Sequence, residues 1–358
     1  MENKPAVRGR GSTINPSGRF ERFAYDDADT DVVQRDEFDD ETPAQIATEY
    51  FRDNTASIIA RNTSPDVGFE ASINPYRGCL HGCVYCFARP THEYLGLSAG
   101  LDFETKIFVK EKAPELLRAK LSSRSWKPTP LALSGVTDPY QPIERRLRLT
   151  RRILEVLAEF RNPVIVITKN HLVTRDVDLL ASLAEHDAVR VAISVTTLDT
   201  ALARTMEPRT SSPERRLDAI ATLSRAGVPV CALIAPVIPG LTDSEVPRVL
   251  ERAAAAGARS AGYVVLRLPH GVKEIFEAWL GAHYPDRKEK VLSRLRALRE
   301  GKLYRSEWGL RMSGTGIFAE QIEALFDASR RRYGLEDRSH GPSTAAFRRP
   351  TSQGQLFD

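Results

Sequence analysis

Long apolar runs are missing from this chain of 358 residues, and none approaches the ~18 to 20 residues that a membrane-spanning helix needs. Residues 1–20 place no apolar segment behind their charged residues, so we expect no export by an ordinary signal peptide. Hydrophobic residues make up 42% of the chain and charged residues 27%, which is close to the average for soluble proteins. The sequence therefore predicts a soluble globular protein with a cytoplasmic location.

Cysteine is scarce as well, with four residues in the whole chain. Three of them, Cys79, Cys83 and Cys86, lie within eight residues. So few cysteines at such close spacing exclude an ordinary disulfide framework. They suit metal ligation in a reducing compartment much better.

A glycine-rich G-x-G-x-x-G turn after an apolar run is also absent, which leaves a dinucleotide site without support. The chain instead alternates short apolar runs with amphipathic stretches. The apolar runs predict six strands, at 69–75, 130–135, 163–169, 189–195, 228–236 and 262–269. Apolar residues three and four apart predict helices at 148–160, 176–186, 212–227, 244–257, 270–281, 285–299 and 317–334. This alternation predicts an α/β fold, a partial (β/α)6 TIM-like barrel with an N-terminal arm and C-terminal helices; an open doubly wound sheet is the alternative.

The composition along the chain divides it into four predicted parts. They are a mostly irregular, acidic N-terminal arm at 1–65, the barrel at 66–270, a C-terminal helical extension at 271–336 and a disordered tail at 337–358. The arm is expected to carry one short helix at 41–53. Residues 26–41 hold nine acids and one base, so the net charge of +4 hides an acidic stretch of −8 against +12 elsewhere.

Residues that could bind a metal or a cosubstrate follow the predicted strands. In a β/α barrel the C-terminal ends of the strands meet at one mouth, where active sites lie. The first strand runs into the three cysteines. Small, hydroxyl and amine side chains end the second, third and fourth strands: Ser134, Gly135, Lys169 and Ser194.

The cysteines are spaced C-x3-C-x2-C on one loop. Three thiolates can hold three irons of a cubane 4Fe-4S cluster and leave the fourth iron open to a substrate or cosubstrate. The alternative is a structural zinc site with His81 as the fourth ligand. Zinc ligands usually arrive as separated pairs, whereas His81 lies between two cysteines, which favours the cluster. Cys231 falls inside the fifth strand and is expected to be a buried small hydrophobe.

A C-x3-C-x-aromatic-C loop after the first strand of a β/α barrel resembles the radical S-adenosylmethionine (SAM) enzymes. The surrounding segments resemble the branch of that superfamily related to spore photoproduct lyase, often called DNA repair photolyase-like. The segments that carry this resemblance are 72–79, 137–144, 167–169, 194–197 and 236–241. The match spans about residues 69–270.

The resemblance implies both a mechanism and its cofactors. In these enzymes a reduced 4Fe-4S cluster cleaves SAM to methionine and a 5′-deoxyadenosyl radical, which abstracts hydrogen from the substrate. It implies a reduced flavodoxin or ferredoxin-type protein as the electron donor. It also implies that the three cysteines hold the cluster and that five residues contact SAM: Tyr85, Ser134, Gly135, Lys169 and Ser194. Ser134 and Gly135 stand where the family has Gly-Gly-Glu, and the acid is missing here.

One departure narrows the expected activity. Spore photoproduct lyases carry a hydrogen-donating cysteine after the second strand, where this chain reads Gly135-Val136-Thr137-Asp138. We therefore expect a radical SAM enzyme with a nucleic-acid-related substrate, in DNA repair or modification, that is not spore photoproduct lyase itself. Two alternatives stay open: a radical SAM enzyme on a protein or small-molecule substrate, and a non-catalytic, metal-stapled nucleic-acid-binding module.

Partners are suggested by charge and by the end of the chain. A basic surface that would bind DNA or RNA is expected from the arginines between 145 and 152 and at 330–332, and Arg8 and Arg10 in the arm could contact phosphates. The acidic stretch 26–41 is expected to fold over this surface. The tail residues Gln353, Leu356 and Phe357 resemble the Q-x-x-L-F peptide with which bacterial repair proteins dock on the sliding clamp. No membrane partner is expected.

Overall fold

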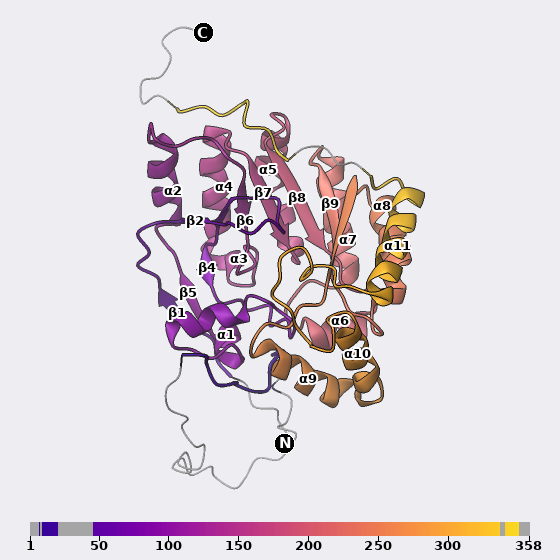
Figure 1. Ribbon diagram of the computed structural model, residues 1–358. Helices are drawn as coiled ribbons and strands as arrows, with labels where there is room; N and C mark the ends of the chain where they lie inside the picture. Colours follow the sequence, from indigo (N-terminus) through magenta and orange to yellow (C-terminus); the bar gives the residue numbers. More distant parts are fainter. Residues whose placement is uncertain (1–6, 8, 21–45, 337–340, 351–358) are drawn as a thin grey trace, which may run out of the picture.

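A computed structural model describes residues 7, 9–20, 46–336 and 341–350 of the chain. Its main sheet has seven strands in the order β10-β9-β8-β7-β6-β3-β2 (Figure 1). Every neighbouring pair is parallel except β2 and β3. The strands are β2 (Ile59–Arg61), β3 (Ala71–Ile73), β6 (Leu131–Leu133), β7 (Val164–Thr168), β8 (Val189–Ser194), β9 (Val230–Val237) and β10 (Ser260–Val265). All six predicted strands are confirmed, as is the partial barrel.

Amphipathic helices cover the convex face of this sheet (Figure 1). They are α2 (Ala113–Ser122), α3 (Glu144–Leu147), α4 (Leu149–Phe160), α5 (Val177–Ala184), α7 (Pro213–Arg225), α8 (Val246–Ala255) and α11 (Ile317–Arg332). In α4 the buried residues Ile153, Leu154 and Leu157 recur at three- and four-residue spacing, so one apolar stripe faces the strands. No described helix is long and apolar enough to cross a membrane.

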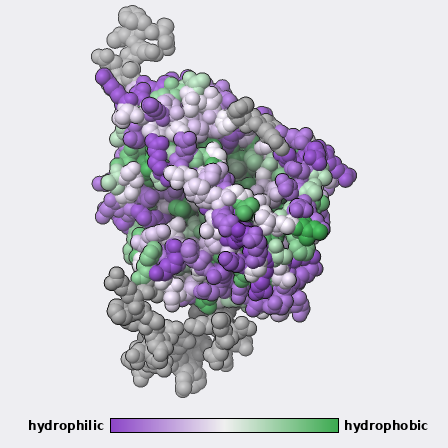
Figure 2. All heavy atoms as spheres, viewed as in Figure 1, coloured by the Kyte–Doolittle hydropathy of each residue, from purple (hydrophilic) through white to green (hydrophobic). Residues whose placement is uncertain are grey.

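The concave face of the sheet is partly accessible to solvent over β7, β8 and β9, whereas all residues of β3 and β6 are buried. Along β7 the buried Val164 and Val166 alternate with the half-exposed Ile165 and Ile167, and β8 and β9 follow the same pattern. Since successive side chains of a strand point to opposite faces, the half-exposed residues line the concave side. Figure 2 shows recessed apolar residues over β8 and β9.

The barrel does not close through its strands, because β2 and β10 are the two edges of the sheet. Residues 303–316, which we call the bridging segment, span this gap. The amide of Val265, the last residue of β10, donates to Met312 O at 2.8 Å. On the other edge Asp66 accepts from the amide of Gly309 at 2.6 Å and forms an ion pair with Arg311.

A second, three-stranded sheet has the order β1-β5-β4, with β1 (Glu49–Arg52), β4 (Tyr76–Arg77) and β5 (Lys106–Val109). The helix predicted at 41–53 is therefore wrong over 49–52. There Tyr50 and Phe51 stand between two charged residues, and Phe51 stacks on Phe108 of β5 with ring centroids 5.0 Å apart. This tertiary pairing overrides the local helical pattern.

Residues that follow the strands form the rest of the mouth. These elements are η2 (Arg89–Leu95), α1 (Leu101–Thr105), η3 (His171–Asp176), α6 (Thr200–Met206), η4 (Asp243–Glu245), α9 (Val272–His283) and α10 (Pro285–Ala297). In Figure 1, α1, α6, α9 and α10 gather in the lower half of the molecule, at the C-terminal ends of the parallel strands.

The described part of the C-terminal tail is ordered against the opposite end of the sheet. The amide of Arg348 donates to Phe160 O at 2.9 Å, and the amide of Ser343 donates to Asp187 O at 2.7 Å. The Phe347 ring also packs against Phe160. The prediction of disorder from residue 337 onward therefore does not hold for 341–350.

Candidate active site

The three cysteines lie on the loop that follows β4, at the mouth of the barrel. All three are free thiols; Cys79 and Cys83 are buried, and Cys86 is half-buried. Cys83 and Cys79 belong to two different apolar clusters, and Cys86 packs against both clusters. Burial raises the pKa of the Cys83 thiol and raises that of Cys86 to about 11. The loop therefore offers three neighbouring sulfur ligands that release protons when metal binds.

The surroundings of the loop fit a cubane cluster better than the zinc alternative. The predicted zinc ligand His81 has both ring nitrogens engaged: Nδ1 lies 3.4 Å from the Asp138 carboxylate and Nε2 lies 3.1 Å from the Asn170 amide nitrogen. A zinc site also needs its donors around one ion, with sulfurs about 3.8 Å apart. Within the described ranges no three His, Cys, Asp or Glu side chains converge in that way. In a cubane each thiolate binds its own iron, so the sulfurs stay apart.

A buried carboxylate, Glu104 of α1, holds the loop from one side. Its oxygens accept hydrogen bonds from the amides of Gly11 and Ser12, both at 2.9 Å, and pair with the guanidinium of Arg89. Arg89 in turn donates to Cys83 O at 2.9 Å. Both Arg89 and Glu104 are fully buried, so their charges compensate each other inside the protein.

The N-terminal arm thus lies directly on the cysteine loop. A Cβ atom built on Gly11 would stand 1.7 Å from the carbonyl oxygen of Gly82, so only glycine fits there. Arg209 joins the same two segments, because its Nε donates to Gly9 O at 2.8 Å and its amide donates to His81 O at 3.3 Å. We call residues 9–12 the strap.

Polar residues after β6 hold the loop from the other side. Gln141 accepts from the Leu80 amide at 2.9 Å, and Thr137 donates to Gly78 O at 2.7 Å. Asp138 accepts from the Lys169 amide at 2.8 Å and from the Thr168 hydroxyl at 2.7 Å. Burial raises the pKa of Asp138, but His81 and these hydrogen bonds outweigh it, and the pKa lies below its usual value. Asp138 therefore links the cysteine loop to β7 as a carboxylate.

Lys169 and Tyr85 meet in a buried polar cluster beside the cysteines. Lys169 Nζ donates to Ala235 O at 2.8 Å and lies 5.7 Å from the centre of the Tyr85 ring. The Tyr85 hydroxyl donates to the carboxylate of Glu207, which also pairs with the buried Arg216 and lies 3.7 Å from Lys169 Nζ. Burial lowers the pKa of Lys169 to about 8. A cationic amine and a phenol thus stand together at the mouth.

The other three predicted SAM residues also lie at strand ends. Ser194 continues the concave side of β8, after Arg190 and Ala192. Ser134 and Gly135 turn beyond β6 with φ of 144° and 138°, a region that disfavours side chains and strains Ser134. The Ser134 hydroxyl donates to Thr137 O at 2.9 Å. The structure therefore brings all five residues to the mouth; their contact with SAM stays a prediction.

Sequence reasoning missed Glu104 and Glu207, the two acids that organise the site. Each is a single carboxylate without a repeated pattern, and its role depends on residues far away in sequence. The signal that could have found them is chemical: a fully buried acid requires a partner, and each has a buried arginine.

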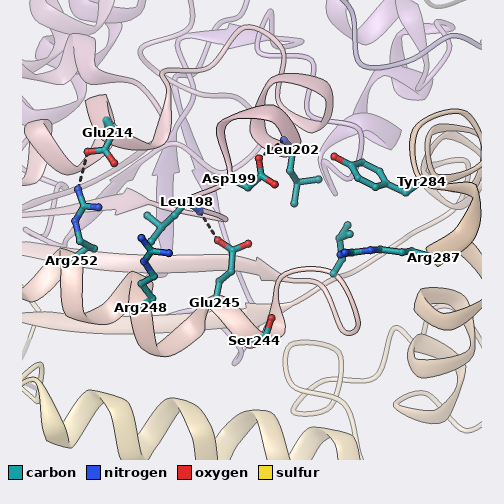
Figure 3. Close-up of a pocket in the computed structure, with 11 residues that line it drawn as sticks. Leu198, Asp199, Leu202, Glu214, Ser244, Glu245, Arg248, Arg252, Tyr284 and Arg287 are labelled. Carbon is teal, nitrogen blue, oxygen red and sulfur yellow. Dashed lines mark hydrogen bonds and ion pairs between the residues drawn. The ribbon is translucent and has the colours of Figure 1, made fainter.

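A separate hollow of about 560 Å³ lies beside the loops that follow β8 and β9 (Figure 3). Its lining comes from α6, α7, η4, α8, the start of α10 and the loops beside them: Leu198, Asp199, Leu202, Glu214, Leu241, Ser244, Glu245, Arg248, Arg252, Tyr284 and Arg287. The carboxylates here serve the fold, since Glu214 pairs with Arg252 and Glu245 accepts from Thr197 and Leu198. None of the predicted site residues lines this hollow.

The predicted basic surface is neutralised only in part, because the ion pairs of the described residues involve Arg151, Arg152 and Arg330. Arg151 pairs with Asp176 and Asp178, and Arg152 pairs with Glu115. Arg10 is buried and donates to Glu104 O at 2.8 Å, so it is not available to phosphates. The acidic stretch 26–41 and the tail residues Gln353, Leu356 and Phe357 lie outside the described residues, so their proposed roles stay predictions.

This site and fold coincide with a known class of proteins. The family model of the radical SAM superfamily matches residues 73–253, from β3 to α8. The chain belongs to the radical SAM superfamily, whose members use a 4Fe-4S cluster and SAM and need a reductant as electron donor.

Among its relatives is an uncharacterised protein of Mycobacterium tuberculosis, 36% identical over 291 residues that cover 81% of this chain and 82% of the relative. A protein of Pseudomonas phage M6 named radical SAM Nalpha-GlyT isomerase is 28% identical over 51% of this chain and 36% of its own length. A solved structure of spore photoproduct lyase complexed with dinucleoside spore photoproduct has a TM-score of 0.55 at 16% identity, over 79% of each chain. This last similarity establishes the fold.

Proposed function

We propose that this chain is a radical SAM enzyme that generates a 5′-deoxyadenosyl radical and acts on a nucleic-acid-related substrate. The observation that carries the proposal is the pairing of three free thiols on one mouth loop with a lysine and a tyrosine beside them. When bound, the cluster supplies one-electron reductive cleavage of SAM to methionine and the radical. A reduced flavodoxin or ferredoxin-type protein is the proposed electron donor.

The chain's own residues would bind and orient the cosubstrate. Cys79, Cys83 and Cys86 are the proposed cluster ligands. Lys169, as an ammonium, is suited to a carboxylate at the mouth, and its present acceptor Ala235 O would be exchanged for that stronger partner. Tyr85 is fixed by Glu207, so its ring edge and hydroxyl are preorganised beside the cysteines. Ser134, Gly135 and Ser194 are the further proposed SAM contacts.

A nucleic-acid-related substrate is supported by the proteins that the chain resembles. The spore photoproduct lyase that shares this fold was solved with a dinucleoside photoproduct bound. Apart from the three proposed cluster ligands, however, no thiol for hydrogen donation lies at the strand ends. Residues 134–138 contain no cysteine. Cys231 is half-buried rather than buried as expected, and it lies six residues of β9, about 20 Å, before the strand end at Val237. We therefore propose an activity other than spore photoproduct repair.

Anaerobic reconstitution tests the first part of the proposal. We expect a brown protein with about four irons per chain that forms 5′-deoxyadenosine from SAM with dithionite. One zinc and no colour would indicate the metal-stapled module instead. With thymine-dimer DNA we expect no spore photoproduct repair, and robust turnover would contradict the assignment. Faster SAM cleavage with a protein or small-molecule substrate than with DNA or RNA would favour the other enzyme class.

A further inference from the structure

Phe87 is an exposed aromatic residue directly after Cys86. Half of its surface is exposed (50%), whereas the adjacent Ala88 is buried in the apolar cluster that contains Cys79 and Phe103. Burial of the exposed half of the ring against a ligand would be favourable. The fold therefore presents a flat apolar surface next to the cysteine loop.

Arg267 approaches this ring from the opposite edge of the mouth, just beyond β10. Its guanidinium carbon lies 5.2 Å from the centre of the Phe87 ring. Nη1 lies 3.5 Å from Met312 Sδ, a weak acceptor on the bridging segment. Nε is buried and has no hydrogen-bond partner in the described part of the chain. A buried donor left unsatisfied in this way is costly, and a ligand that supplies an acceptor removes that cost.

The charge around Arg267 is also uncompensated. Asp66, whose charge interacts with that of Arg267, is already paired with Arg311 across the gap of the barrel. Arg305 of the bridging segment is paired with Glu300 and Glu307. Among the residues that the structure describes, Arg267 forms no such ion pair. Burial, together with the charge of Arg267, lowers the pKa of Arg299 to about 10, as expected where positive charge lacks a counter-ion.

We propose that Phe87 and Arg267 form a platform for one nucleobase of the substrate. The base stacks on the Phe87 ring, as bases stack on aromatic side chains in single-stranded nucleic-acid sites. Arg267 donates to an acceptor on the base edge or on the adjoining phosphate. The position beside Cys86 places the nucleotide next to the site of radical formation. This inference rests on the proposed nucleic-acid function and names the residues that would carry it.

The test measures binding of a fluorescein-labelled, mixed-sequence single-stranded DNA, and of the same sequence as RNA, to the reconstituted protein by anisotropy. Phe87→Ala is expected to weaken binding of the preferred strand by about 5- to 150-fold, the range for losing one stacked base. Phe87→Trp should retain the affinity. Arg267→Gln should weaken binding and flatten its dependence on salt concentration.

Tyr94→Ala is the matched control, because Tyr94 is an equally accessible aromatic residue (68% exposed) that stacks on Phe20. Iron content and the absorption spectrum of each variant verify that the cluster is loaded. If the wild type binds nucleic acid and Phe87→Ala binds it equally well, the platform is overturned and the proposed function still stands. A wild type that binds neither DNA nor RNA overturns both. If Phe87→Ala binds SAM more weakly but nucleic acid equally well, the Phe87 ring contacts SAM instead, and the platform is overturned as well.

Discussion

The two sides of the barrel mouth differ in how completely their polar groups are paired. On the closed side, which carries the cysteine loop, the strap and α1, Glu104 accepts from two amides and one guanidinium, all buried. On the open side, which carries β10 and the bridging segment and faces Phe87 across the mouth, Arg267 has a buried nitrogen without a partner in the described part of the chain. The cysteine loop is thus held by a buried, charge-paired carboxylate, whereas Arg267 keeps a free donor for the nucleotide that we propose it binds.

This contrast also appears in the strands. The concave residues Ile165, Ile167 and Leu233 are half-exposed, while residues of the same strands that face the helices are fully buried. A closed barrel would fill this face with side chains. Here the gap between β2 and β10 is spanned by an irregular segment tied at Asp66 and Met312. The fold therefore keeps an accessible interior.

Replacing the cysteines should give the largest effect. We expect Cys79→Ser, Cys83→Ser or Cys86→Ser to remove most of the iron after reconstitution and to abolish 5′-deoxyadenosine formation, because each thiolate binds one iron. Iron assay and absorption spectra measure this. Cys231→Ser, on β9 far from the mouth, should keep both cluster and activity. A full cluster in any variant of the three loop cysteines would contradict the proposed ligand set.

Disturbing the strap tests the closed side. Gly11→Ala forces a methyl group against the backbone carbonyl of Gly82, which has to move together with the cysteine loop. We expect cluster absorbance to disappear in air about ten-fold faster than in the wild type, as for lost supporting contacts at other metal sites. Gly68→Ala is the control, since its added Cβ meets no atom within 4 Å. Equal lifetimes for the two variants would show that the strap does not support the loop.

Removing the amine of Lys169 should weaken SAM binding by about 10- to 100-fold, the usual value of a charge-assisted hydrogen bond. Lys169→Met keeps the length of the side chain, and calorimetry with SAM under anaerobic conditions measures the loss. Lys127→Met, at an exposed position, is the control. Unchanged affinity in Lys169→Met would mean that the lysine serves only the Glu207 cluster.

Among the described residues, the closed side also has two buried nitrogens without a hydrogen-bond partner, Nε of Arg10 and Nδ1 of His92. Titration of His92 should produce the smallest effect. Burial lowers the pKa of His92 to about 4, whereas an unfolded histidine titrates near 6.5. Between these values the unfolded chain binds a proton that the folded chain does not. The free energy of unfolding should therefore fall as pH drops from 6.5 toward 4, by at most about 1.4 kcal/mol per pH unit. In denaturant titrations His92→Phe should show a shallower fall; an identical slope would contradict this origin.

The sequence predicts the sheet well and the frame around the mouth poorly. Apolar runs such as 163–169 and 228–236 are long, and the helices between them are strongly periodic, so local pattern suffices. β1, β4 and β5 are short, and β1 is exposed throughout, so its pairing depends on distant partners. The ordered segment 341–350 is polar and finds its contacts only on the finished sheet.

The candidate site divides in the same way. Closely spaced cysteines are visible in sequence, since their chemistry depends on local spacing, and Lys169 and Ser194 follow from their strands. Glu104 and Glu207 are not visible, because each acts through an arginine and through backbone groups from several segments. The sequence predicts that Arg10 contacts phosphates, whereas the structure buries Arg10 against α1. This burial depends on tertiary packing and is not visible in the local sequence.

Hydrogen abstraction from nucleic acid is the most direct test of the account. The reconstituted enzyme is incubated with unlabelled SAM, a reductant and uniformly deuterated DNA or RNA, and 5′-deoxyadenosine and SAM are analysed by mass spectrometry. We predict that deuterium enters one of these two compounds from one of the nucleic acids. Cleavage of SAM without deuterium transfer from either DNA or RNA, but with transfer from a deuterated protein or metabolite pool, would contradict it.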